Sequence, residues 1–126
     1  MRLRLGTFPL ALAALALILA APAPADARAY RAFVGCGADF PEPDHNCSIG
    51  DAPAAYLKPF RKAVRYRVCV RNPAGRTRCR RGRAERRRYD WLYVARGAVG
   101  SYRVTWFVGG KRVARWRYRM HPEADA

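Results

Sequence analysis

Residues 100–120 alternate between apolar and mostly basic side chains, and this pattern constrains the fold more than any other feature of the chain. A period of two is that of a β-strand with one buried face. Between the two halves, Gly109-Gly110 can adopt the positive φ values of a type I′ turn. The segment is therefore predicted to form a β-hairpin with a core face and a basic face. The apolar positions are Tyr102, Val104, Trp106, Val108, Ala114, Trp116, Tyr118 and Met120, and the opposite positions are Arg103, Thr105, Phe107, Arg115, Arg117 and Arg119.

The first 29 residues have the order of a secretory signal peptide. Arg2 and Arg4 precede an apolar run over residues 10–21, and residues 25–29 offer small-x-small cleavage sites. The alternative is a membrane anchor, but the run is shorter than the roughly 20 residues that a spanning helix needs. We therefore expect a signal peptide over residues 1–29 and a mature chain that is secreted or associated with the cell envelope.

The remaining chain is predicted to be a single domain over residues 30–120, followed by a polar tail over residues 121–126. Short strands separated by frequent turn residues favour a small antiparallel all-β sandwich. Residues 54–57 fit either a strand or one helical turn, and residues 82–88 are expected to be a basic connection. The three tryptophans are expected in the core. Besides the hairpin, strands are expected over residues 30–36, 63–71, 76–81 and 89–95.

Four cysteines in an exported domain of this size are typical of two disulfides. Of the three possible connectivities, we expect Cys36–Cys47 and Cys69–Cys79, because each pair is close in sequence. Cys69 and Cys79 are also equidistant from Ala74, at the centre of a predicted turn, so they fall opposite each other on two strands. A zinc site is the alternative, but no pair has the C-x₂-C spacing of such sites.

Residues 100–104, Gly-Ser-Tyr-Arg-Val, resemble the tyrosine corner that opens the penultimate strand of immunoglobulin-like domains. The Gly109-Gly110 hairpin and the strand after it resemble the last two strands of bacterial immunoglobulin-like modules. The resemblance covers mainly residues 63–120 and extends to small secreted proteins of GC-rich bacteria. It implies an immunoglobulin-like β-sandwich and no particular activity, because this architecture hosts many functions.

Charge is distributed unevenly along this strongly basic chain, whose formal net charge is +16. Residues 30–56 hold one basic and four acidic residues, whereas residues 57–120 hold 21 basic and two acidic residues. Such asymmetry points to a polyanionic partner. Arginine outnumbers lysine 22 to 3, however, and a GC-rich genome produces the same bias through its codons. Selection for binding and composition bias both remain open as explanations.

The candidate site is the outer face of the sheet. If the strand over residues 64–71 pairs beside that over residues 101–108, Phe107 and the Cys69–Cys79 bridge lie among seven arginines on one surface. Guanidinium groups bind phosphate, sulfate and carboxylate through a planar fork, so the face could hold nucleic acid, teichoic acid, acidic polysaccharide or anionic lipid. The alternative is a solvated face that prevents aggregation. The seven arginines are Arg65, Arg67, Arg71, Arg103, Arg115, Arg117 and Arg119.

Two neighbouring segments have interpretations of their own. Residues 76–88 contain eight arginines and form either a flexible basic arm or an exposed loop. The acidic loop over residues 36–47 could fold onto the basic face. It could also bind calcium through Asp39, Glu42 and Asp44, although their spacing fits no calcium-loop pattern.

Catalytic groups are scarce. The only histidines are His45 and His121, and neither Ser48 nor Ser101 has a base in its sequence context. We therefore predict no catalytic residues, no metal, no cofactor and no small-molecule substrate. The prediction is a monomeric, non-enzymatic binding or cell-envelope module. The alternative is a secreted inhibitor or antibacterial effector that uses the rigid loop over residues 72–75.

Overall fold

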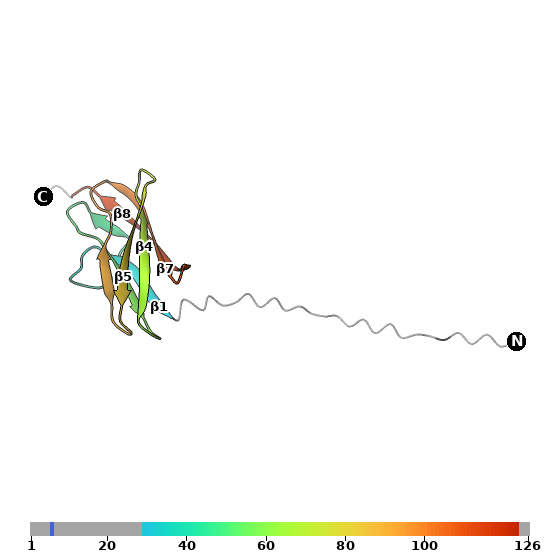
Figure 1. The fold of residues 1–126 in the computed structure, drawn as a ribbon. Coiled ribbons are helices and arrows are strands. Elements are labelled where there is room, and N and C mark those ends of the chain that lie inside the picture. The colour runs from blue at the N-terminus through green and yellow to red at the C-terminus, as the bar shows by residue number, and fades with distance from the viewer. Residues whose placement is uncertain (1–5, 7–28, 124–126) are drawn as a thin grey trace.

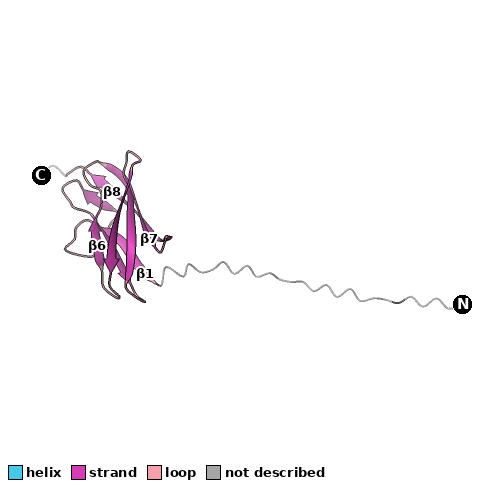
Figure 2. Cartoon of the chain, viewed as in Figure 1, coloured by secondary structure: helices cyan, strands magenta, loops and turns pink. Residues whose placement is uncertain are grey.

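A computed structural model describes residue 6 and residues 29–123, so the predicted signal peptide lies almost wholly outside the described residues. The described part of the chain is all-β and contains no helix (Figure 2). Accordingly, it contains no helix with the length and apolar character needed to span a membrane. The strands are β1 (Tyr30–Gly35), β2 (Asn46–Ser48), β3 (Ala54–Pro59), β4 (Val64–Arg71), β5 (Thr77–Ala84), β6 (Asp90–Tyr93), β7 (Gly100–Val108) and β8 (Lys111–His121).

The strands form two sheets. One has three strands in the order β1-β3-β6, and the other has five in the order β2-β8-β7-β4-β5. All pairings are antiparallel except that of β2 with β8. Figure 1 shows β4 lying between β5 and β7 in the larger sheet. The predicted all-β class is confirmed.

The hairpin of β7 and β8 forms where the alternating pattern predicts it. Gly109 and Gly110 have φ values of 58° and 77°, as a type I′ turn requires. The register places Val104 opposite Trp116, and it shifts at a β-bulge between Trp106 and Phe107. The bulge changes which residues of β8 share the outer face.

The core lies between the two sheets. Trp106 and Val104 of β7 are 0% and 1% exposed, and they pack in one cluster with Val34 and Leu57 of the smaller sheet. Val68 of β4 belongs to the same cluster, so the apolar alternation of β4, like that of β7, faces inward. The opposite face of the larger sheet is therefore left to solvent.

Both predicted disulfides are present. Cys36–Cys47 joins the end of β1 to β2 and closes the acidic loop, and Cys47 is 3% exposed. Cys69–Cys79 joins directly opposed residues of β4 and β5, with Cα atoms 4.0 Å apart. The second bridge therefore lies within one sheet.

Three features differ from the sequence-based expectation or settle it. Residues 54–57 belong to a strand. β5 continues to Ala84, so residues 82–84 belong to a strand and not to the predicted connection. Almost all side chains of β5 are exposed, so the sequence of this strand lacks the apolar alternation from which its end could be predicted. Trp91 is 39% exposed, because β6 turns its odd-numbered side chains outward at the end of a three-stranded sheet. The expectation of a core Trp91 is wrong.

Candidate functional site

The seven predicted arginines are exposed and lie on the outer face of the larger sheet. Because side chains alternate along a strand, arginines at alternate positions of β4, β7 and β8 share the face opposite the core. The register brings them into rows across the sheet. Arg71 is opposite Arg103, and Arg103 is opposite Arg117. The exposed residues are Arg65, Arg67, Arg71, Arg103, Arg115, Arg117 and Arg119.

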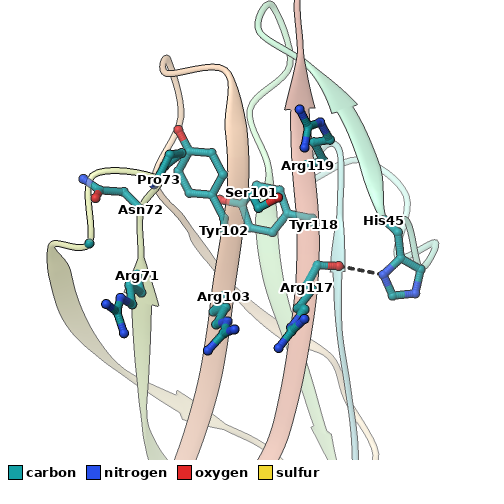
Figure 3. Close-up of a pocket in the computed structure, with 11 residues that line it drawn as sticks. His45, Arg71, Asn72, Pro73, Ser101, Tyr102, Arg103, Arg117, Tyr118 and Arg119 are labelled. Carbon is teal, nitrogen blue, oxygen red and sulfur yellow. Dashed lines mark hydrogen bonds between the residues drawn. The ribbon is translucent and has the colours of Figure 1, made fainter.

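Arg71, Arg103 and Arg117 form a row of three positive charges across the face. Figure 3 shows the three side chains side by side on β4, β7 and β8. Adjacent strands lie about 4.8 Å apart, and like charges directly opposite each other destabilise a sheet. The row therefore carries an electrostatic cost that a bound anion would relieve.

No carboxylate relieves this cost within the described residues. The ion pair found there joins Arg83 to Glu85, with an Nε–Oε1 distance of 3.4 Å, and it involves none of the seven predicted arginines. A β-sheet face on which arginines only serve solubility commonly carries charges of both signs. This face carries one sign.

Two adjoining hollows, of about 690 Å³ and about 1230 Å³, lie on this face. His45, Arg71, Arg103 and Arg117 line both of them. Both are wide open to solvent, so they form a shallow groove rather than an enclosed pocket. A groove of this shape suits an extended ligand better than a small enclosed one.

Aromatic rings and one disulfide complete the groove. The Arg67 guanidinium lies 4.7 Å from the centre of the Phe107 ring, a cation–π contact that orders this arginine. Beneath the upper end of the groove, on the core side of the sheet, the buried rings of Tyr102 and Tyr118 stack with centroids 4.8 Å apart. The Tyr118 hydroxyl donates to the Ala95 carbonyl at 2.6 Å, and burial raises its pKa.

The acidic loop packs against β8 and supplies His45. The His45 and Trp116 rings stack with centroids 4.1 Å apart. The His45 Nδ1 donates to the Arg117 carbonyl at 2.6 Å, as Figure 3 shows. The Trp116 Nε1 donates to the Asp44 carbonyl at 2.8 Å, and the Arg119 amide donates to the His45 carbonyl at 2.8 Å. No acid of the loop forms an ion pair with an arginine of the face in the described range.

Several residues of the same face were not predicted from the sequence. Arg81 and Arg83 pair with Arg67 and Arg65 across β4 and β5. The position of Cys79 opposite Cys69 fixes this register and could have revealed them. Arg112 pairs with Phe107 next to the turn, and the β-bulge beyond it places Arg112 on the same face as Arg115, which strict alternation along β8 does not reveal. His45 reaches the groove through the pairing of β2 with β8 and through the Cys36–Cys47 bridge, and no local sequence pattern predicts this placement.

One group of metal-ligating residue types occurs among the described residues. Cys36, Cys47 and Asp51 have ligand atoms within 4.8 Å of one another. The two sulfur atoms are bonded to each other, so they are not thiolates that could hold zinc. Asp39, Glu42 and Asp44 do not form such a group.

Comparisons with known proteins found no matching family model, no matching curated protein and no matching solved structure.

Proposed function

We propose that this protein is an exported, non-enzymatic binding module that holds a polyanion on the arginine face of its larger sheet. The observation that carries the proposal is the row of Arg71, Arg103 and Arg117, opposed directly across three strands without a carboxylate partner. A ligand with several anionic groups neutralises several arginines at once and releases its counterions.

The shape of the groove supports an extended ligand. The two hollows together follow β4, β7 and β8, and the arginines lie at intervals along all three strands. A guanidinium group offers a planar pair of donors to phosphate, sulfate or carboxylate oxygens. Phe107 adds flat apolar surface between the charges. The same site therefore suits nucleic acid, teichoic acid, acidic polysaccharide or a layer of anionic lipid.

We further propose that the fold is an immunoglobulin-like sandwich. In that fold, strands A, B and E share one sheet, and strands C, F and G share the other. β1, β3 and β6 would take the first set of places, and β4, β7 and β8 the second, with β5 as an added strand C′. The Tyr102 hydroxyl donates to the Ala98 carbonyl at 2.7 Å, which is the hydrogen bond expected of a tyrosine corner.

Export is supported by the two disulfides, since such bonds persist in oxidising compartments. It is also supported by the composition of residues 1–29. The intact mass of the protein recovered from the producing cells, measured before and after reduction and alkylation, tests both points. Without reduction, we expect the mass of a chain that lacks about residues 1–29 and carries no alkyl group. After reduction, we expect this mass to increase by that of four alkyl groups, one on each cysteine.

Retention on immobilised heparin, on DNA and on anionic lipid vesicles tests the binding proposal, with neutral vesicles as the control surface. We expect retention at low salt on at least one anionic surface, weakening steeply as salt rises toward about 0.2 M. Absence of retention at low salt, or retention that salt does not weaken, contradicts the proposal.

A further inference from the structure

The Cys69–Cys79 disulfide forms part of the larger hollow of the arginine face. Cys79 is exposed and Cys69 is half-buried. Arg67 and Arg71 flank Cys69 at two residues' distance on the same face of β4, and Arg81 flanks Cys79 in the same way on β5. No aspartate or glutamate lines this hollow. The disulfide is therefore both accessible and surrounded by positive charge.

The other disulfide has the opposite surroundings. Cys47 is 3% exposed, and the Asp51 carboxylate lies within 4.8 Å of both sulfur atoms of the Cys36–Cys47 bridge. The loop that this bridge closes also carries three further acids, Asp39, Glu42 and Asp44. Cys36 is half-buried, as Cys69 is, so the main difference between the bridges is that an anion that approaches Cys36–Cys47 meets negative charge.

We propose that Cys69–Cys79 is a thiol–disulfide exchange site for small anionic thiols, and thus a site of reversible S-thiolation. Positive charge raises the local concentration of an anionic thiol and accelerates its encounter with the disulfide. It also stabilises the thiolate that leaves, and a leaving thiol with a lower pKa leaves faster. The inference uses the charge of the arginine face and does not depend on its binding a polyanion.

The exchange balances without any other reactant. The thiolate of the small thiol attacks the exposed Cys79 sulfur, the Cys69–Cys79 bond breaks, and Cys69 leaves as a thiolate beside Arg67 and Arg71. Cys79 is now in a mixed disulfide with the small thiol. A second thiolate attacks the small-thiol sulfur of that mixed disulfide and releases Cys79 as a thiolate. In total, the protein disulfide gains two electrons, and two small thiols become one small disulfide.

The fold can accommodate this cycle because the bridge joins strands that are already paired. β4 and β5 are in register from Val64 opposite Ala84 to Arg71 opposite Thr77. The bridge spans a sequence separation of 10 residues around a short turn. Cys36–Cys47, in contrast, closes a loop of mostly irregular structure. Opening Cys69–Cys79 therefore leaves the hydrogen-bonded ladder of the sheet in place.

The test uses the intact, oxidised protein and three probe thiols at equal thiolate concentration: anionic 2-mercaptoethanesulfonate, neutral 2-mercaptoethanol and cationic cysteamine. Samples are alkylated at intervals, and peptide masses give the reduced fraction of each disulfide. At low salt, we expect Cys69–Cys79 to react about tenfold faster with the anionic than with the cationic thiol. Salt should reduce this ratio, and Cys36–Cys47 should react more slowly with the anionic thiol.

The double variant Arg67→Gln/Arg71→Gln should lose most of the preference for the anionic thiol. Arg61→Gln/Arg96→Gln removes the same charge from exposed positions outside the hollow and should keep the preference. Equal rates for the anionic and cationic thiols, or faster reduction of Cys36–Cys47, would overturn the inference. A protein that shows the rate preference but no retention on heparin, DNA or vesicles would retain this inference and refute the proposed function.

Discussion

At the scale of single residues, the close packing of Gly82 and Tyr66 shows how the edge strand β5 is joined to the core. A Cβ atom at Gly82 would lie 2.7 Å from the Cζ and hydroxyl oxygen of Tyr66. Tyr66 is 3% exposed, and its hydroxyl donates to the Asp90 carboxylate, so its ring cannot easily move aside. Glycine is therefore required at this position for steric reasons.

We predict that Gly82→Ala lowers the free energy of unfolding by about 1–3 kcal/mol, because the added methyl group forces the Tyr66 ring to shift. Denaturant unfolding of the purified variant measures this change. Gly37→Ala is the matched control, since nothing lies within 4 Å of a Cβ at Gly37. It should stay within about 0.5 kcal/mol of the wild type. Equal stability of the two variants would refute the steric explanation.

Buried tyrosines should make the fold sensitive to alkaline pH. Burial raises the pKa of Tyr118, and burial together with the hydrogen bond to Asp90 raises the pKa of Tyr66. The unfolded chain releases these protons near pH 10, while the folded chain retains them. Their contribution to stability is therefore complete below about pH 10 and declines as the pH rises above it.

Denaturant unfolding at about pH 9 and about pH 11 should show this loss of stability directly. Tyr118→Phe removes one of the tyrosines whose pKa is raised and should make the dependence of stability on pH shallower. Tyr93→Phe, at a residue that is 47% exposed, should leave the dependence unchanged. A stability that does not fall between the two pH values would contradict the assignment of these tyrosines.

At the scale of elements, the β7–β8 hairpin depends on backbone conformation at its turn. Gly109 has a φ of 58°, and no atom lies within 4 Å of a Cβ placed there. Substitutions at Gly109 should therefore differ in stability only through the backbone strain that each side chain causes. Gly109→Asn should stay within about 0.5 kcal/mol of the wild type, because asparagine tolerates the left-handed region and suits this turn. Gly109→Val should cost about 1–2 kcal/mol. Thermal unfolding of both variants checks this, and equal costs would contradict it.

The elements that the sequence predicts best are those with one face in the core. In β4 and β7, apolar side chains alternate with polar ones because one sheet face packs on the other sheet. β5 lies at the edge of the larger sheet, and nearly all its side chains are exposed. Its sequence therefore shows no alternation of apolar and polar residues, and the prediction ended the strand at residue 81 instead of Ala84. β2 has three residues and depends on pairing with β8, which is distant in sequence.

The same reasoning explains how much of the arginine face was predictable. Arg103, Arg117 and Arg71 follow from alternation within strands, and their exposure is as expected. The contribution of Arg112 depends on the β-bulge, and that of His45 depends on contacts with β8 made across the molecule. Tertiary register, and not residue type, decides which further groups join the face.

At the scale of the whole molecule, the net charge of +16 should oppose folding at low ionic strength. Salt screens this repulsion, since the Debye length falls from about 30 Å at 0.01 M to about 8 Å at 0.15 M. We therefore expect the melting temperature to rise with salt over this range. Calorimetry at both concentrations tests the expectation, and a melting temperature that falls with salt would contradict it.

The central claim is that the position of the arginines, and not the total charge, determines polyanion binding. Two triple variants separate these causes, because each removes three positive charges. Arg71→Gln/Arg103→Gln/Arg117→Gln changes the row across the groove, and Arg61→Gln/Arg86→Gln/Arg96→Gln changes exposed arginines that do not line it.

The most direct measurement is the slope of log K against log salt concentration for binding to short double-stranded DNA, a polyanion of known charge spacing. Each lost phosphate contact makes the negative slope shallower by about 0.9. The slope of the row variant should therefore be shallower by about 2.7, while the slope of the control variant stays near that of the wild type. Equal reductions in the two triple variants would show that net charge alone attracts the ligand, and would contradict the claim that the arginine face is the binding site.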